Sequence, residues 1–138
     1  MADENTFIML KPDCMKRGLV GEIITRIERK GYRIIDAKMM KLSAAFLYEH
    51  YAHLADQPFF PLILQHMLSG PVFGMIVRGE NAVLGMRLLV GATKFEDAQP
   101  GSIRGDYALS TINNLIHCSH TVEIGEQEIK RFFSTATA

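Results

Sequence analysis

The sequence predicts an α+β domain of the ferredoxin-like, split βαβ type, with a four-stranded antiparallel sheet covered by helices. Short apolar runs typical of buried strands alternate with longer segments whose apolar residues recur at helical spacing. Four such runs separated by helical segments give the βαβ pattern twice, which favours a two-layer domain. The length of 138 residues, without repeats or linkers, fits one domain spanning 1–138.

The first half of the chain is expected to begin with a buried strand, a helix and a half-buried strand. Residues 6–10 are a continuous apolar run, typical of a strand buried on both faces. Residues 18–30 carry apolar side chains at helical spacing, and Gly31 provides a left-handed stop. Residues 32–40 have the mixed pattern of a half-buried strand, and Ser43 is expected to cap the helix that follows.

Aromatic and histidine pairs in the next segment allow more than one interpretation. Phe59 and Phe60, at the start of a short helix, cannot both face one core stripe. One of them is therefore expected to be exposed, as a stacking surface or against another subunit. His50 and His53 have the i, i+3 spacing of a helical metal site, but the spacing supplies no complete ligand set, so we expect this pair to be solvated.

The second half is expected to contain a buried strand at 72–77, a helix capped by Asn81, a long loop at 92–106, a short strand at 115–118 and a final helix capped by Thr121. Loops of that length in compact domains are usually functional or mobile, although this one lacks the GxxxxGK[ST] pattern of a P-loop. Gly125 lies inside the last helix, where glycine costs roughly 1 kcal/mol against alanine, so a close packing approach is expected there.

The composition argues against nucleic-acid and membrane partners. Fifteen basic and fifteen acidic residues cancel, which leaves no general field to attract a polyanion or an anionic membrane. Cys14 and Cys118 are too few for a disulfide framework and lack zinc-type spacing, which fits a reducing compartment. The polar N-terminus is unlike a signal peptide, and no run approaches the roughly 18 apolar residues of a membrane span. We therefore expect a cytoplasmic protein.

The segment around His117 is the part of the chain richest in reactive groups. Leu115-Ile116 place His117 at the end of a short buried strand, among amide, thiol and hydroxyl side chains. An imidazole there could be a nucleophile, a general base, a metal ligand or a hydrogen-bonded core residue. These residues by themselves leave the choice open.

Dispersed cations suggest a site for phosphate. Lys11 follows the first strand, Arg87 lies on the polar side of a helix, and Arg104 belongs to the long loop. With the hydroxyl of Thr93 they could form a phosphate clamp, because arginine offers a planar fork of donors and lysine a compact charge.

Short motifs in a fixed order carry a resemblance to a known family. They are Leu10-Lys11-Pro12-Asp13, Tyr51 with Pro58-Phe59-Phe60, Ser69-Gly70-Pro71, Gly91-Ala92-Thr93, Pro100-Gly101-Ser102-Ile103-Arg104-Gly105-Asp106 and Asn114-Leu115-Ile116-His117-Cys118-Ser119. Each motif is weak by itself, but their order and combined length are specific. On this basis the chain resembles the nucleoside diphosphate kinase family over nearly its whole length.

The resemblance implies transfer of the terminal phosphate from a nucleoside triphosphate to a nucleoside diphosphate, by a ping-pong mechanism through phosphorylated His117. A neutral imidazole can attack phosphorus without first losing a proton. The resemblance implies that Lys11 and Asn114 bind the ribose hydroxyls, with Lys11 also near the transferred phosphate, and that the phosphates contact Tyr51, Arg87, Thr93 and Arg104. It also implies that Phe59 stacks on the base beside Ile63. Ser119 and Glu128 would orient His117.

The resemblance also implies partners. A stacked base with few edge contacts gives low base specificity, and Mg²⁺ would arrive with the nucleotide phosphates, so no fixed metal site made only of protein ligands is expected. Members of the family assemble as hexamers or tetramers, so a homo-oligomer is expected here.

Departures from the family pattern keep other interpretations open. Cys118 and His120 stand where the family usually has glycine and aspartate, and Phe95 and Leu54 replace a common proline and histidine. One alternative is a catalytically weak relative that binds nucleotides in a regulatory or interaction role. Another is zinc or copper binding by His117, Cys118 and His120, which have suitable donors but no independent fourth ligand.

Overall fold

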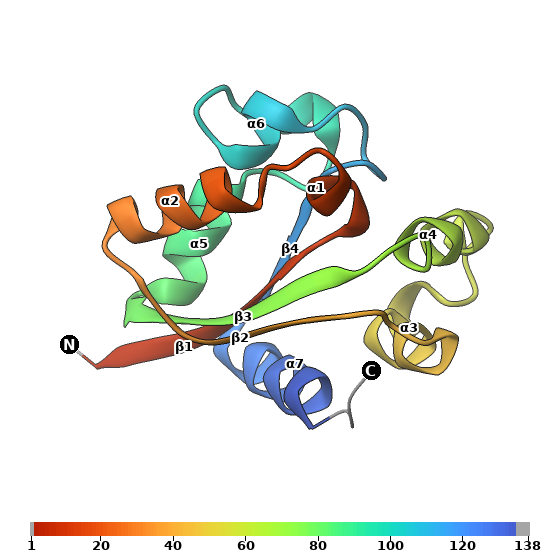
Figure 1. Ribbon diagram of the computed structural model, residues 1–138, viewed down its shortest axis with the longest axis horizontal. Helices are drawn as coiled ribbons and strands as arrows, with labels where there is room; N and C mark the ends of the chain where they lie inside the picture. The colour runs from red at the N-terminus through yellow and green to blue at the C-terminus, as the bar shows by residue number, and fades with distance from the viewer. Residues whose placement is uncertain (1, 135–138) are drawn as a thin grey trace.

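One antiparallel sheet organises the protein, whose computed structural model describes residues 2–134 (Figure 1). Within these residues the sheet has four strands in the order β2-β3-β1-β4. The strands are β1 (Asp3–Leu10), β2 (Arg33–Met40), β3 (Val72–Glu80) and β4 (Ile116–Cys118). β1 pairs with β3 along its whole length and with β4 at its C-terminal end. This is the order of the split βαβ topology, so the predicted fold class is confirmed.

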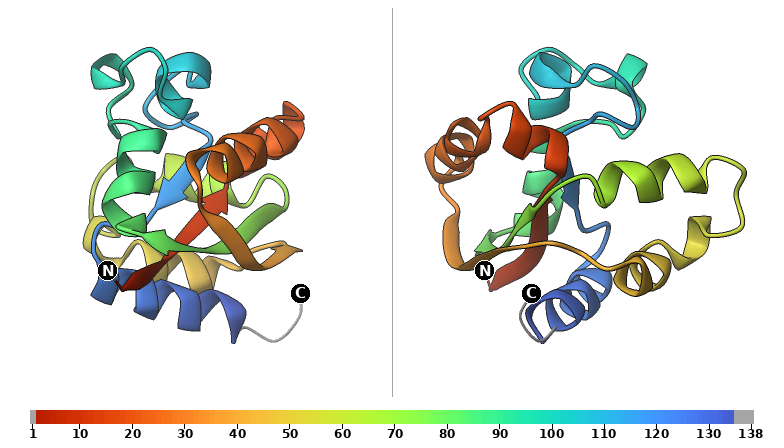
Figure 2. Two further views of the ribbon diagram at one scale, coloured as in Figure 1. Left: turned by 90° about the vertical axis from the view of Figure 1, so that its left-hand side faces the viewer. Right: turned by 45° about the vertical axis from the view of Figure 1, so that its right-hand side comes forward.

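Helices cover both faces of the sheet. They are α1 (Pro12–Lys16), α2 (Val20–Lys30), α3 (Ala44–His50), η1 (Ala52–Leu54), α4 (Phe60–Met67), α5 (Ala82–Val90), η2 (Phe95–Asp97), α6 (Ile103–Tyr107) and α7 (Val122–Phe133). α2 and α5 lie on one face, whereas α7 and α3 lie on the other, as the views in Figure 1 and Figure 2 agree. The expected two-layer arrangement is therefore wrong in its number of layers, because α7 turns back beneath the sheet.

The continuous apolar run of β1 explains why both faces need a cover. Neighbouring residues of a strand point to opposite faces. Ile8 and Leu10 accordingly join the core cluster that includes residues of α2 and α5. Phe7 and Met9 join the cluster that includes residues of α3 and α7, among them Phe132. The prediction of a strand buried on both faces is confirmed.

The three predicted N-cap residues precede their helices as expected, but only two of them cap through the side chain. Ser43 Oγ accepts a hydrogen bond from the Phe46 amide at 3.0 Å, and Thr121 Oγ1 accepts one from Ile124 at 3.0 Å, so both predicted caps are confirmed. Asn81 does not cap α5 through its side chain with any described residue. It has a φ of 53° instead, which makes it the left-handed residue of the turn between β3 and α5.

The long loop is more regular than expected. Residues 92–106 include η2 and most of α6, because Ser102 Oγ accepts a hydrogen bond from the Gly105 amide at 2.9 Å and starts a helix too short to show periodicity. Arg26 of α2 holds this segment through an ion pair of 2.8 Å with Asp106. Its guanidinium also lies 5.0 Å above the Tyr107 ring. The loop is thus braced against α2.

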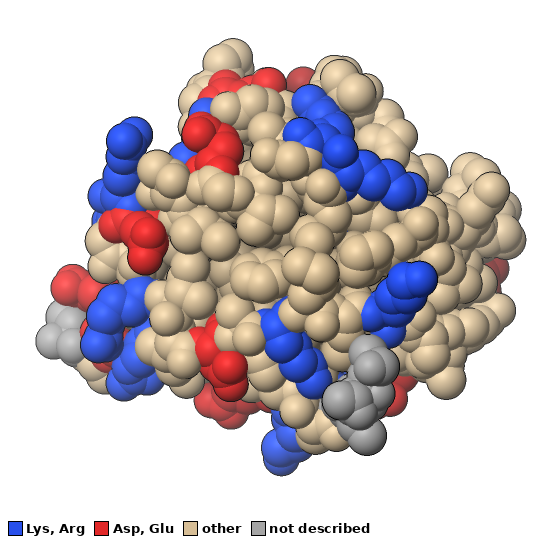
Figure 3. Space-filling model, viewed as in Figure 1, with Lys and Arg blue, Asp and Glu red and all other residues tan. Residues whose placement is uncertain are grey.

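The surface carries interspersed charges. Figure 3 shows Lys and Arg side chains mixed with Asp and Glu over much of the face seen in Figure 1, while the right-hand part of that face is largely uncharged. Among the described residues, no helix combines the length and apolar character needed to cross a lipid bilayer.

Candidate active site

A cavity of about 890 Å³ opens beside β4 and receives side chains from α3, α5, α7 and the 91–104 segment. The residues predicted for catalysis or nucleotide binding that line it are Lys11, Tyr51, Arg87, Thr93, Arg104, Asn114, His117 and Glu128. The fold therefore gathers side chains that are dispersed over most of the sequence. Ser119 lies behind the lining, where it contacts Glu128.

A hydrogen-bonded chain holds His117. Its Nε2 atom lies 2.9 Å from Oε2 of Glu128, and Ser119 Oγ donates to the other carboxylate oxygen at 2.8 Å. Ser119 in turn accepts a hydrogen bond from the Phe7 amide at 3.1 Å. In the tautomer that donates from Nε2 to Glu128, the lone pair of His117 is on Nδ1, which makes Nδ1 the nucleophilic atom.

Glu128 is a buried carboxylate whose charge is compensated. Burial by itself would raise the pKa of Glu128, but the hydrogen bond and charge of His117, with the hydrogen bond from Ser119, hold that pKa below its ordinary value. The carboxylate is therefore ionised at neutral pH and can fix the tautomer of His117. Gly125 makes this packing possible, since a Cβ there would lie 3.1 Å from Ser119 Oγ. The predicted close approach at Gly125 is confirmed.

Leu115 has an uncommon backbone conformation immediately before β4. Its φ is 75°, and the Ile116 amide bonds to the Asn114 carbonyl at 2.9 Å, which defines a three-residue γ-turn. Its carbonyl accepts from the Lys11 amide at 2.8 Å and its amide donates to Asp13 Oδ2 at 3.1 Å. Such strain in a non-glycine residue is typical of functional sites, and here it sets the direction of the strand that bears His117.

Lys11 and Asn114 form one polar pair in the cavity. Lys11 Nζ donates to Asn114 Oδ1 at 2.8 Å. Burial, with the nearby charge of Arg104, lowers the pKa of Lys11 to about 8. The ammonium is therefore charged at pH 7 and loses its proton just above the physiological range.

Arg104 is a buried cation that ties the 91–104 segment to β4. It is 6% exposed, and its guanidinium donates to the carbonyls of Gly91 at 3.1 Å and of Ile116 at 2.5 Å. Burial lowers its pKa, yet an arginine remains charged at neutral pH. Tyr51 is also buried, which raises the pKa of its phenol, so this hydroxyl stays protonated and can donate. Arg87 lies exposed on the cavity wall.

His50 is a site residue that the sequence interpretation missed. The expected solvation of His50 and His53 is wrong for His50, which is 6% exposed, whereas His53 is exposed. The His50 ring stacks on Phe46 and lies 4.7 Å from the His117 ring, centroid to centroid. The sequence does contain a signal for the burial of His50, because His50 follows the buried Phe46 and Leu47 at helical spacing of four and three residues.

The predicted base-binding residues lie outside the cavity lining. Phe59 precedes α4 and is 42% exposed, whereas Phe60 is 2% exposed, so one of the two is exposed as predicted. Ile63 is half-buried and packs against the cluster around Phe132. The structure does not bring Phe59 and Ile63 into the lining beside His117.

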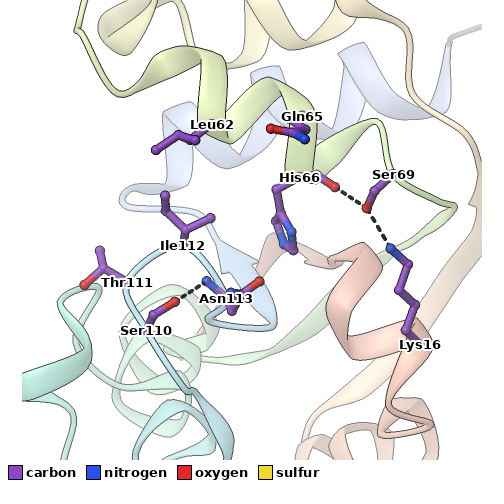
Figure 4. Close-up of a pocket in the computed structure, with 9 residues that line it drawn as sticks. All are labelled: Lys16, Leu62, Gln65, His66, Ser69, Ser110, Thr111, Ile112 and Asn113. Carbon is purple, nitrogen blue, oxygen red and sulfur yellow. Dashed lines mark hydrogen bonds between the residues drawn. The ribbon is translucent and has the colours of Figure 1, made fainter.

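Another cavity, of about 640 Å³, lies between α4 and residues 110–113 and shares no lining residue with the first (Figure 4). His66 points into it from α4. Its Nε2 atom is 3.0 Å from Asp13 Oδ1, the carboxylate that also accepts the Leu115 amide. This cavity therefore lies next to Asp13, whose carboxylate accepts a hydrogen bond from the Leu115 amide in the γ-turn.

The metal-binding alternative involves a different group from the one considered in the sequence. Among the described residues, the donors close enough to share one ion belong to His50, His117 and Glu128, with ligand atoms within 4.8 Å of one another. Cys118 and His120 also line the cavity but are outside this group. The trio of His117, Cys118 and His120 is therefore not assembled as a ligand set.

The fold and the cavity define a class of protein. A histidine fixed by a carboxylate, facing a cavity lined by lysine and arginine side chains on a split βαβ sheet, has the parts that a phosphotransferase with a histidine nucleophile needs.

Comparisons with known proteins agree with this class. The family described as nucleoside diphosphate kinase matches residues 4–138. Nucleoside diphosphate kinase of Moorella thermoacetica is 45% identical over 136 residues, covering 99% of this chain and 98% of the relative. Among solved structures, the Halobacterium salinarum nucleoside diphosphate kinase in complex with CDP is 44% identical with a TM-score of 0.92, covering 98% of this chain and 90% of that one. The apo Encephalitozoon cuniculi kinase is 42% identical with a TM-score of 0.92, covering 98% and 92%.

This chain belongs to the nucleoside diphosphate kinase family. It is an enzyme, a phosphotransferase of that class.

Proposed function

We propose that this enzyme transfers the terminal phosphate of a nucleoside triphosphate to a nucleoside diphosphate in two steps, with His117 as the intermediate acceptor. The observation that carries the proposal is the chain Ser119–Glu128–His117, which leaves Nδ1 of His117 as the nucleophile beside a cationic cavity. In the first step, Nδ1 bonds to the terminal phosphorus while the bond to the leaving diphosphate oxygen breaks. In the second step, a nucleoside diphosphate oxygen displaces the imidazole.

The cations stabilise the charge of the transferred phosphoryl group. Phosphoryl transfer requires positioning and electrostatic stabilisation more than covalent help. Lys11 and Arg104 are charged at pH 7 and line the same cavity as His117, and Arg87 lies on its wall. As phosphorylation makes the His117 ring more positive, the ionised Glu128 at 2.9 Å stabilises it.

The nucleotide extends from this cavity toward α4. We assign the phosphates to Tyr51, Arg87, Thr93 and Arg104, and the ribose hydroxyls to Lys11 and Asn114. The base would stack on Phe59, whose exposed ring lies outside the cavity lining, with Ile63 nearby on α4. A base stacked at an exposed position gives low base specificity. The CDP complex of the Halobacterium relative supports nucleotide binding by this fold.

Magnesium is the cofactor, delivered with the nucleotide. Mg²⁺ prefers oxygen ligands and commonly binds through substrate phosphates. The cavity offers mostly cationic and imidazole groups, with Glu128 already engaged by His117 and Ser119. The residues present thus fit a magnesium ion held by phosphate oxygens.

Isotope labelling tests the proposal. Protein incubated with γ-labelled ATP and Mg²⁺ is expected to carry an acid-labile, alkali-stable label that discharges onto added nucleoside diphosphate. His117→Ala should lose the label, whereas His53→Ala, which removes an exposed histidine, should keep it. A folded wild-type protein without label, or a labelled His117→Ala protein, would overturn the proposal.

Cys118 and His120 favour a second candidate, a nucleotide-binding protein with weak turnover. Both side chains line the cavity next to His117, where the family commonly has smaller or acidic residues. Measuring nucleotide affinity and phosphate exchange on one preparation separates the candidates, because this one predicts binding without turnover. A recovery of exchange in the Cys118→Gly, His120→Asp double variant would support it.

We further propose a cytoplasmic homo-oligomer, hexameric or tetrameric, built from one domain spanning 1–138. β2 is an edge strand of the sheet, and it exposes Ile35 by 49% and Met39 by 57%. Exposed apolar groups on an edge strand favour association with another surface. The free thiols of Cys14 and Cys118 fit a reducing compartment.

A further inference from the structure

Metal-ligating groups meet at the inner wall of the cavity, behind the proposed nucleophilic atom. Oε2 of Glu128 lies 2.9 Å from Nε2 of His117 and 4.0 Å from Nε2 of His50. The ligand atoms of this group are all within 4.8 Å of one another. Zinc bonds of about 2.0–2.2 Å separate tetrahedral ligands by roughly 3.3–3.5 Å, so side-chain shifts of about 1 Å would bring these donors around one ion.

His50 gives an independent reason to place a ligand there. Its side chain is buried and, among the described residues, its Nε2 atom lacks a hydrogen-bond partner. Imidazole binds metals in its neutral form, through the lone pair of one ring nitrogen. A buried polar atom without a partner requires an explanation, and an ion would satisfy it.

We propose that His50, His117 and Glu128 form an inhibitory binding site for Zn²⁺ or a similar divalent transition metal. Two imidazole nitrogens and one carboxylate oxygen are common zinc ligands, and water from the cavity can complete the tetrahedron. Mg²⁺ and Ca²⁺ prefer oxygen ligands, so they are poor occupants of this site. The site is distinct from the magnesium that accompanies the nucleotide.

The inhibitory role follows from the tautomers of imidazole and rests on the proposed function. A neutral His117 ring carries one proton, which lies on Nε2 while this atom donates to Glu128. Metal bound at Nε2 requires the lone pair of that atom, so the proton moves to Nδ1. Nδ1 then has no lone pair for attack on phosphorus, and the ion also removes Glu128 from its role as orienting acceptor.

Arg131 opposes metal binding. Its Nη1 atom lies 3.4 Å from His50 Nδ1, a contact that favours the tautomer with the proton on Nε2. A metal at Nε2 needs the opposite tautomer, with an N–H directed at the guanidinium. Arg131 also pairs with Glu49 at 3.1 Å, which gives it another acceptor when that contact is lost. Replacing Arg131 by methionine should therefore tighten zinc binding.

Direct binding tests the site without reference to activity. Tag-free, chelator-treated full-length protein is titrated with Zn²⁺ by calorimetry and with Co²⁺ by visible absorption. We expect one ion per chain and the intense visible bands of tetrahedral cobalt. His50→Phe, which keeps an aromatic ring against Phe46, and Glu128→Gln should each lose at least about tenfold in affinity, since even outer partners of a metal site commonly account for that much.

Matched control variants test whether zinc binding depends specifically on the proposed ligands. His53→Ala and His120→Ala remove other histidines that line the cavity and should bind zinc as the wild type does. Far-UV circular dichroism checks that each variant is folded, and Glu128→Gln decides the matter if His50→Phe is not. Absence of stoichiometric binding, equal binding by folded His50→Phe, or loss of binding in His120→Ala would overturn the site.

A separate measurement tests inhibition. Protein loaded with one equivalent of zinc and freed of excess metal is mixed with γ-labelled ATP and Mg²⁺, and its labelling rate is compared with that of metal-free protein. We expect labelling to be lost and then restored by a chelator that is selective for zinc over Mg²⁺. Unchanged labelling of the zinc-loaded protein would overturn the inhibitory role. Failure of metal-free protein to label would instead contradict the proposed function, and the binding data would still decide the metal site.

Discussion

At the scale of residues, a short chain of buried hydrogen bonds determines what His117 can do. Ser119 satisfies one oxygen of Glu128 and Nε2 of His117 approaches the other. The geometry gives the imidazole one tautomer and one orientation. Lys11 contributes an ammonium group whose pKa is lowered to about 8, so activity should fall at alkaline pH.

Ser119→Ala should weaken both stability and turnover. The change leaves the Phe7 amide and one oxygen of Glu128 without their partner, which costs about 1–3 kcal/mol of unfolding free energy. The looser carboxylate should lower kcat more than it raises KM, because the orientation of His117 matters mainly in the reaction step. Denaturant unfolding and steady-state kinetics measure the two effects. Ser69→Ala, at an exposed site, is the control, and equal behaviour of the two variants would contradict this interpretation.

The lowered pKa of Lys11 predicts that activity falls at alkaline pH. Its pKa is lowered to about 8, so the ammonium charge is present below that pH and is lost as the pH rises through it. We expect kcat/KM to decline above about pH 8 in a profile measured from pH 6 to 10. Lys11→Arg should have lower activity but a flat profile over this range, because arginine keeps its charge. An unchanged alkaline decline in that variant would assign the effect to another group.

At the scale of elements, α2 supports the segment that carries Arg104. Arg26 bonds to Glu22 on its own helix at 2.9 Å and to Asp106 of α6 at 2.8 Å, and it lies over Tyr107. The contacts hold α6 at the cavity although α6 is too short to be stable alone.

Arg26→Met should therefore affect substrate binding from a distance. We expect KM for the nucleotide to rise several-fold with a smaller change in kcat, since Arg104 would be held less firmly. Because these ion pairs are partly exposed, the loss of unfolding free energy should be only about 1 kcal/mol. Arg29→Met, an exposed position on the same helix, provides the control. Unchanged KM in a folded Arg26→Met protein would show that α6 does not depend on this brace.

At the scale of the whole molecule, the unpaired edge of the sheet is the feature that points beyond one chain. β2 has a neighbour on one side only in the described part of the sheet, and Met39 is 57% exposed on it. A charge at the centre of an apolar contact opposes burial.

Met39→Lys should shift the assembly toward smaller species. Sedimentation velocity over a range of concentrations should show an oligomer for the wild type and a larger fraction of monomer for the variant. Leu68→Lys, at another exposed apolar residue, should sediment as the wild type does. A monomeric wild type at every concentration would contradict the proposed homo-oligomer.

The sequence by itself determined the order and type of the main elements, and it indicated the residues that we propose for the phosphate site. Periodicity and turn chemistry are local properties, so the run at 6–10, the stop at Gly31 and the caps at Ser43 and Thr121 could be predicted from neighbouring residues. The motif order indicated the family, and the fold then brought Lys11, Arg104 and His117 to one cavity.

Only the tertiary structure decided how that cavity is supported. The burial of His50, the γ-turn at Leu115 and its contact with Asp13 depend on residues far apart in the chain. Asparagine is a residue type that commonly caps helices, but the turn from β3 into α5 requires a left-handed backbone conformation at Asn81. Local patterns describe what each segment prefers, whereas long-range packing selects which polar atoms become buried and which partners they meet.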